Sequence, residues 1–209
     1  MADLNALSNA LIAGDAGKLE GLVQGALNEG MEAKEILNGG LIKGMDIVGE
    51  KMQNGDMFIP EVLMSAKAMS ASVEILKPLL STEDASAAGK VVMGTAKGDL
   101  HDIGKNLVLM MLESAGFEII NLGTDVSPED FVAAVKEHDA NIIGISALLT
   151  TTMGAMKDTI DALAEAGYRD KVKVIIGGAP VNQKYADEIG ADGYAADAGS
   201  ASKLAKSLV

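Results

Sequence analysis

The sequence predicts an α/β domain with a parallel sheet, preceded by a smaller all-α domain. Over residues 1–80, apolar residues recur at the three- and four-residue spacing of helices. From Lys90 onward, short runs rich in valine and isoleucine alternate with helical patterns, as in sheets built from β-α-β units. The stretch 81–89 is small, polar and without periodicity, and we interpret it as a linker. The expected domains are therefore residues 1–80 and 90–209.

The composition limits the class of protein. The chain has 209 residues, no cysteine and a net charge of −13. The lack of cysteine excludes disulfides and thiolate metal sites and is typical of a cytoplasmic protein. The acidic charge argues against a nucleic-acid partner, because nucleic acids bind basic surfaces. No apolar run approaches the roughly 20 residues of a membrane span, and no basic-then-apolar secretory segment opens the chain, so we expect no membrane partner.

Four helices are predicted in the N-terminal domain. Asp15 is expected to cap the second of them, which stops at Gly30. Gly39-Gly40 predicts a break or kink in the third, because each glycine weakens a helix by about 1 kcal/mol relative to alanine. Pro60 suits the first turn of the fourth. The helices are expected over about 4–14, 15–30, 32–54 and 60–76, and their short connections indicate a small antiparallel bundle.

Five strands alternate with helices in the C-terminal domain. Ser127-Pro128-Glu129-Asp130 marks one helix start, with serine as the N-cap and acidic residues in the first turn. Strands rich in valine and isoleucine between helices indicate a parallel sheet covered on both faces, as in the flavodoxin-like fold. The strands are expected over 91–95, 117–121, 142–146, 172–176 and 192–195, and the helices over 105–115, 127–138, 153–166, 181–189 and 200–208.

The stretch 98–106 carries the most chemistry. It joins the first strand to the helix after it, so it lies at the carboxyl edge of the sheet, where open α/β folds bind ligands. His101, one of two histidines in the chain, stands two residues after Asp99. Asp99 can accept a hydrogen bond from one imidazole nitrogen and direct the other outward, as beside a metal-ligating histidine. On the residues alone, a histidine that caps the next helix is an equal alternative.

The pattern Asp99-x-His101-x-x-Gly104 resembles the cobalamin-binding signature of B12-dependent methyltransferases and mutases. Two further parts of that signature, Ser146-Ala147-Leu148 and Gly177-Gly178, follow in order and at similar spacings. The resemblance implies a cobalamin or other corrinoid cofactor, methylcobalamin in the methyl-loaded state, and the flavodoxin-like fold of most B12-binding modules. It also implies that His101 is the axial ligand of cobalt and that Asp99 is its hydrogen-bonding partner.

The same resemblance assigns roles to other residues. Thr152 stands where methionine synthase has a serine whose hydroxyl contacts the aspartate, and so completes a ligand relay. Ser146, Thr150 and the glycine pair correspond to positions around the displaced nucleotide tail of the cofactor. The implied cofactor-binding set beyond His101 and Asp99 is Gly98, Asp102, Gly104, Ser146, Leu148, Thr150, Gly177, Gly178, Ala198 and Phe58.

The helical half indicates a branch of the family. Residues 48–50 and 57–62 resemble the signature of the helical cap in methyltransferase corrinoid proteins, in which Phe58 would shield the upper face of the cofactor. The chain is similar to the stand-alone corrinoid proteins of methanogens and acetogens, which serve demethylation of methanol, methylamine, betaine or methoxyaromatics. These proteins are methyl carriers that are not catalytic alone.

The resemblance also implies the partners of such a carrier. It accepts a methyl group on Co(I) from a substrate:corrinoid methyltransferase and donates it from methyl-Co(III) to a methylcorrinoid:acceptor methyltransferase. A reductive activase is a third implied partner. The methyl donor, the acceptor, the oligomeric state and the lower base of the corrinoid stay open.

Three alternatives remain. A B12-dependent sensor would share both domains but usually adds a DNA-binding segment. A hydrolase would use Asp99, His101 and Ser146, although the Gly-x-Ser-x-Gly elbow is absent from the sequence. A phosphoacceptor receiver would need an aspartate at the end of the third strand, where Ser146 stands. The second histidine, His138, is expected at the surface near a helix C-terminus.

Overall fold

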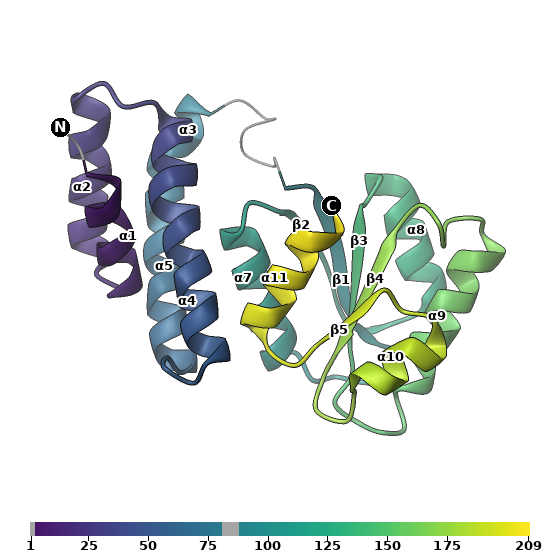
Figure 1. Cartoon of the computed structure of the whole chain (residues 1–209). Helices are drawn as coiled ribbons and strands as arrows, with labels where there is room; N and C mark the ends of the chain where they lie inside the picture. Colours follow the sequence, from purple (N-terminus) through teal and green to yellow (C-terminus); the bar gives the residue numbers. More distant parts are fainter. Residues whose placement is uncertain (1–2, 81–87) are drawn as a thin grey trace. The chain divides into compact units, whose positions relative to one another are not determined.

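The computed structural model describes residues 3–80 and 88–209 and divides the chain into two compact units (Figure 1). The first unit is helical, and the second, which begins at Ala88, is built around a parallel sheet. The expected fold class, an all-α domain followed by an α/β domain, is confirmed. Most of the predicted linker 81–89 lies outside the described residues, so the linker stays a prediction.

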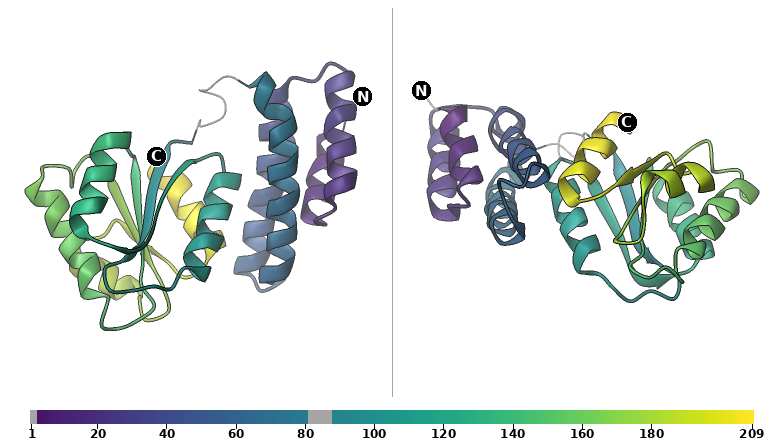
Figure 2. Two further views of the ribbon diagram at one scale, coloured as in Figure 1. Left: turned by 180° about the vertical axis from the view of Figure 1, so that it is seen from behind. Right: turned by 60° about the horizontal axis from the view of Figure 1, so that its bottom comes forward.

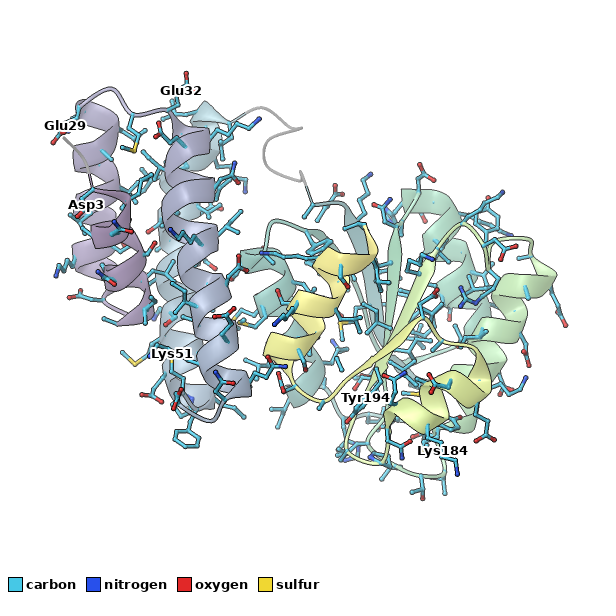
Figure 3. The ribbon with its side chains drawn as sticks, viewed as in Figure 1. Asp3, Glu29, Glu32, Lys51, Lys184 and Tyr194 are labelled. Carbon is cyan, nitrogen blue, oxygen red and sulfur yellow. The ribbon has the colours of Figure 1, made fainter. Side chains whose placement is uncertain are left out.

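The helical unit contains the four expected helices. Asp3 and Asp15 cap the first two, because their side chains accept hydrogen bonds from backbone N–H groups of the first turn. Asp3 and Glu29, labelled in Figure 3, mark the start of the first helix and the end of the second. The helices of this unit are α1 (Leu4–Ile12), α2 (Ala16–Asn28), α3 (Ala33–Glu35), η1 (Ile36–Ile42), α4 (Lys43–Gln53), α5 (Ile59–Leu76) and the short η2 (Lys77–Leu79).

The irregularity expected at Gly39-Gly40 is present, but it is a π-helical segment rather than a break. The segment η1 contains both glycines and joins α3 to α4 without interruption. The Ser8 hydroxyl donates a hydrogen bond to the Gly40 carbonyl at 2.7 Å. A Cβ atom at Gly39 would lie 2.9 Å from a methyl carbon of Leu4. The glycines therefore let α1 pack closely on a widened helical turn.

The second unit contains a five-stranded parallel sheet in the order β2-β1-β3-β4-β5, which is the flavodoxin-like order. Helices α8, α9 and α10 cover one face, and α7 and α11 cover the other (Figures 1 and 2). Strands and helices alternate in the order β1 (Lys90–Ala96), α7 (Ile103–Ser114), β2 (Glu118–Val126), α8 (Pro128–His138), β3 (Ile142–Ser146), α9 (Gly154–Glu165), β4 (Lys173–Gly177), α10 (Gln183–Ile189), β5 (Gly193–Ala195) and α11 (Ala198–Leu208).

The core under α8, α9 and α10 fixes the register of the sheet. Val92, Ile143 and Val174 are neighbours on β1, β3 and β4, and each is fully buried. They belong to one cluster with Phe131 of α8 and Leu163 of α9. Burying each such side chain stabilises the fold by about 1.5–3 kcal/mol. This packing therefore keeps the central strands in register, so that their carboxyl ends lie side by side.

Some predicted boundaries are wrong, and each error has a local cause. The second strand extends to Val126 rather than ending at Asn121. It is an edge strand with two register shifts against β1, so its last residues carry polar side chains and a glycine and do not show a strand pattern. Helices α10 and α11 begin directly after their caps, Asn182 and Asp197.

Among residues 3–80 and 88–209, no helix has both the length and the apolar content needed to cross a bilayer.

Candidate functional site

The carboxyl ends of the three central strands bring the predicted motifs together. Thr95, Ser146 and Gly177 are neighbours in the sheet at the ends of β1, β3 and β4. The loops that follow these strands, 97–102, 147–153 and 178–182, contain most of the predicted site residues. Segments that lie far apart in the sequence therefore form one edge of the sheet.

Asp99 lies at the centre of this edge and is fully buried. Its Oδ1 accepts hydrogen bonds from His101 Nδ1 at 2.7 Å and from the His101 backbone N–H at 3.1 Å. Its Oδ2 accepts from the N–H groups of Leu148 at 2.7 Å and Leu149 at 3.2 Å, and from the Thr152 hydroxyl at 2.8 Å. One carboxylate thus joins the loop after β1 to the loop after β3, with the Thr152 contact in the expected place.

The hydrogen bonds keep Asp99 ionised despite its burial. Burial alone raises the pKa of this carboxyl, because it penalises the charged form. The hydrogen bonds from the Leu148 N–H, from the ring and backbone of His101, and from Thr152 lower the pKa further than burial raises it. The net result is a pKa well below the usual range of aspartate. An ionised Asp99 accepts a hydrogen bond from His101 Nδ1–H and so fixes the imidazole tautomer that leaves Nε2 with a free lone pair.

The backbone of His101 is fixed on both sides, whereas its ring is half exposed. The backbone N–H donates to Asp99, and the carbonyl accepts a hydrogen bond at 2.9 Å from the hydroxyl of buried Thr95. The side chain is 51% exposed, and Nε2 makes no hydrogen bond to any residue that the structure describes. A rigid loop therefore presents one imidazole nitrogen outward, as a metal ligand requires.

The residues around His101 fit a corrinoid. Leu100 and Ile103 beside His101 are 73% and 83% exposed, and Leu148 and Leu149 of the neighbouring loop are 44% and 42% exposed. Large apolar side chains left exposed beside one another mark a binding surface, and here they suit the hydrocarbon periphery of a corrin ring. A single imidazole from the protein would be a suitable ligand for the cobalt of such a cofactor.

The glycine pair at the end of β4 also has a structural reason within the chain. We expected Gly177 and Gly178 to let a cofactor approach the backbone. The structure shows that a Cβ at Gly178, where φ is +128°, would lie 1.8 Å from the Ala147 carbonyl oxygen. A Cβ at Gly177 would lie 3.0 Å from the Ala195 carbonyl oxygen. The two glycines are therefore needed for packing within the chain, and contact with the cofactor tail stays a prediction.

Among the residues that the structure describes, the other predicted residues of this unit make no hydrogen bond to the His101 ring. The Gly98 N–H donates to the Asp125 carboxylate, and Asp102 accepts a hydrogen bond from the Asn106 amide. Gly104 is the second residue of α7, and buried Ala198 is the first residue of α11. Their contacts with a cofactor stay predictions.

The positions of Ser146 and Thr150 bear on the hydrolase and receiver alternatives, and their predicted contacts with the cofactor tail stay predictions. Ser146 ends β3 and Thr150 is exposed in the loop that follows. In the described part of the chain, no hydrogen bond joins Ser146 to His101. The hydrolase alternative thus lacks contact between its nucleophile and its base in this structure. Ser146 also occupies the strand end where a receiver would need an aspartate.

Phe58 lies in the helical unit and precedes α5. Its backbone N–H donates to the Glu61 carboxylate at 2.9 Å, and its ring is 68% exposed. Ile59, Leu63 and Met64 in the first turns of α5 are exposed as well. This unit therefore carries an apolar surface of its own. The expected place of Phe58 over the cofactor stays a prediction.

Two contributors to the site were missing from the sequence prediction. Thr95 was expected only as a strand residue, and Asp125 was taken to lie in a loop. A hydroxyl or carboxylate at the carboxyl end of β1 or of its neighbour β2 is the signal that could have found both. Asp125 was missed because the second strand was expected to end at Asn121, four residues before it, whereas the strand continues to Val126.

Comparison with known proteins gives a consistent result for both units. Models described as B12 binding domains match residues 89–202 and residues 3–77. The dimethylamine corrinoid protein of Methanosarcina barkeri is 46% identical over 208 residues, which are 99% of this chain and 97% of that relative. The name of that relative associates it with dimethylamine.

Two solved structures resemble the whole chain. A cobalamin-binding protein from Desulfitobacterium hafniense DCB-2 superposes with a TM-score of 0.87 at 35% identity, covering 100% of both chains. The methanol:cobalamin methyltransferase complex MtaBC from Methanosarcina barkeri contains a chain with a TM-score of 0.84 at 32% identity, covering 98% of this chain and 78% of that one. The motifs, the fold and these relatives agree, and the chain belongs to the family of B12-binding corrinoid proteins.

Proposed function

We propose that this protein is a corrinoid methyl carrier in which the His101 imidazole would ligate the cobalt. The observation that carries the proposal is the hydrogen-bonded pair Asp99–His101, with Nδ1 bound to the carboxylate at 2.7 Å and Nε2 directed outward. The names of the relatives, a dimethylamine corrinoid protein and a methanol:cobalamin methyltransferase complex, support the methyl-carrying role.

The protein's own groups would ligate and orient the cofactor. When bound, the corrinoid cobalt supplies the methyl-carrying chemistry, and the protein sets its environment. The negative charge of Asp99 makes the His101 imidazole a better electron donor and holds its ring in one orientation. The Leu148 and Leu149 N–H groups keep Asp99 from turning away from the ring. This arrangement is pre-formed, since every contact lies within the protein.

The partners follow from the proposed role. A carrier needs a methyltransferase that loads it and a second one that unloads it, and the MtaBC complex supports the first of these. We propose that the methyl donor is a small methylated compound, with methanol or a methylamine supported by the names of the relatives. A reductive activase is the third proposed partner. The cytoplasmic location expected from the composition stays a prediction.

A labelled methyl group tests the proposal. The protein reconstituted with reduced corrinoid would be mixed with a panel of methyltransferases and ¹⁴C-labelled methanol, methylamines, betaine or a methoxyaromatic. We expect label to remain with the protein after gel filtration for one enzyme and donor pair, and to move to an acceptor when a second methyltransferase is added. Stable corrinoid binding without label from any pair would contradict the carrier role and would favour the sensor alternative.

A further inference from the structure

Asp125 stands out because its backbone is strained. Among the described residues that are not glycine, only Asp125 and Asp139 have a positive φ, at 54° and 51°. This left-handed conformation costs an ordinary residue about 1–2 kcal/mol. For Asp139 the reason is plain, since it is the C-cap of α8. Asp125 lies inside β2, where no helix ends, so its conformation needs another reason.

The contacts of Asp125 give that reason. Its Oδ1 accepts a hydrogen bond from the Gly98 N–H at 2.7 Å. Its own N–H donates to the Asp99 carbonyl at 2.9 Å. Asp125 therefore holds the Gly98–Asp99 segment from both ends, with its side chain on one residue and its backbone on the next. A straight strand would not direct both groups to the same loop, whereas a bulge with a left-handed residue re-aims them.

Those contacts act directly on the placement of the Asp99 carboxylate. The loop after β1 turns at Gly98, where φ is +84°, and the Asp99 N–H returns to the Ala96 carbonyl at 3.0 Å. Asp125 makes two further hydrogen bonds to this turn, one to Gly98 and one to Asp99. A shift of the Asp99 backbone would change the 2.7 Å distance to His101 Nδ1 and with it the direction of Nε2. The strand β2 thereby controls the aim of the histidine from outside the signature motif.

We infer that Asp125 is a positioning residue for His101, acting through the backbone of Gly98 and Asp99. The inference rests on the proposed role of His101 as the cobalt ligand. Asp125 acts as a hydrogen-bond acceptor at a left-handed backbone position, so its charge is not the essential property. Asparagine offers the same acceptor oxygen and tolerates this conformation. Glycine tolerates the conformation but has no acceptor.

Three variants separate the acceptor from the backbone strain. Asp125→Gly removes the acceptor and relieves the strain, whereas Asp125→Asn keeps both the acceptor and the backbone conformation. Asp139→Gly is the matched control, because it removes the other aspartate at a positive φ. The readouts are the dissociation constant for hydroxocobalamin, from visible titration, and the ¹⁵N spectrum of the His101 ring in the cofactor-free full chain.

We expect Asp125→Gly to weaken hydroxocobalamin binding about tenfold, as loss of a partner behind a metal ligand commonly does. Its ring ¹⁵N spectrum should show a mixture of the two imidazole tautomers in place of one. Asp125→Asn should bind within about twofold of wild type with an unchanged ring spectrum, and Asp139→Gly should match wild type in both readouts.

Two results would overturn the inference. One is an unchanged ring spectrum in Asp125→Gly together with wild-type affinity. The other is an equal loss in Asp125→Gly and Asp139→Gly, which would indicate a general structural effect. If wild type itself bound no corrinoid, the proposed function would fail, and the ring spectrum of the cofactor-free protein would still decide whether Asp125 positions His101.

Discussion

Asp99 and Asp192 lie at opposite edges of the same sheet, and each is held by several donors of different kinds. At the amino edge, Asp192 accepts hydrogen bonds from the Val174 N–H and the Lys173 ammonium and pairs with Arg169 at 2.8 Å. Two permanent cations therefore compensate its charge. At the carboxyl edge, Asp99 accepts from backbone N–H groups, a hydroxyl and an imidazole.

The difference shows how one residue type serves structure at one edge and function at the other. Cations neutralise the charge of Asp192. Its role is therefore structural, and it ties β4 to β5. The charge of Asp99 is stabilised by the dipoles of backbone N–H groups and a hydroxyl. It therefore acts on the imidazole of His101, to which it is hydrogen-bonded. Open α/β sheets bind ligands at this carboxyl edge. The following predictions test the contrast, beginning with the largest expected effect.

Glycine substitutions should show that the carboxyl edge is packed backbone against backbone. Gly178→Ala would place a Cβ 1.8 Å from the Ala147 carbonyl oxygen at a positive φ, and we expect a loss of about 4 kcal/mol in unfolding free energy. Gly89→Ala at the amino edge would meet only the Asn141 side chain, at 2.8 Å, and should cost about 1–2 kcal/mol. Urea unfolding measures both, and equal losses would contradict the contrast.

Removing each aspartate should affect different properties. Asp99→Ala leaves the Leu148 and Leu149 N–H groups without their acceptor, so we expect a loss of about 3 kcal/mol in unfolding free energy. Hydroxocobalamin affinity should fall about 10–100-fold as well. Asp192→Ala should cost about 1 kcal/mol and leave the affinity unchanged. A comparable loss of affinity in both variants would indicate that the effect on binding is a general consequence of instability.

Acid should reveal the stabilised charge of Asp99. Its pKa in the folded protein lies below the unfolded value of about 3.9, so ionised Asp99 contributes stability that is fully present above that pH. The contribution is lost as pH falls through the folded pKa. We expect the difference in unfolding free energy between wild type and Asp99→Asn to be constant between about pH 5 and 8 and to shrink below about pH 4. A difference that grew in acid would contradict the assigned pKa direction.

The smallest effect should come from Thr152. Its hydroxyl donates to Asp99, so Thr152→Val should cost about 1 kcal/mol in unfolding free energy. Thr152→Ser keeps the hydroxyl and loses only a methyl group, and should cost about 0.5 kcal/mol. A larger loss in Thr152→Ser than in Thr152→Val, measured by urea unfolding, would show that the methyl group rather than the hydroxyl is what matters at this position.

The fold class and the Asp99–His101 pair at the centre of the site could be predicted from the sequence, and the reasons are physical. Strands such as 142–146 are buried on both faces, so they read as continuous apolar runs. Asp99 and His101 are two residues apart, so their contact is local and follows from spacing. The alternation of strands and helices predicted a parallel sheet, and the resemblance to B12-binding modules implied the flavodoxin-like fold.

Other parts of the site depend on long-range geometry that local patterns do not contain. The N–H groups of Leu148 and Leu149 carry no side-chain signal, yet they hold Asp99 across 49 and 50 residues of chain. Asp125 was missed because an edge strand with bulges does not show a regular alternation of apolar and polar residues. The reason for Gly178 is the Ala147 carbonyl in the loop after the neighbouring strand β3, and only the folded register reveals this contact.

The central claim is that the His101 imidazole, held by Asp99, binds the cobalt of a corrinoid. The most direct test is the visible absorption spectrum of protein reconstituted anaerobically with hydroxocobalamin, for wild type and His101→Ala. We predict stoichiometric uptake by wild type with the spectrum of a histidine-ligated corrinoid, and loss of that spectrum in His101→Ala. Identical spectra in the two proteins, or no uptake by wild type, would contradict the claim.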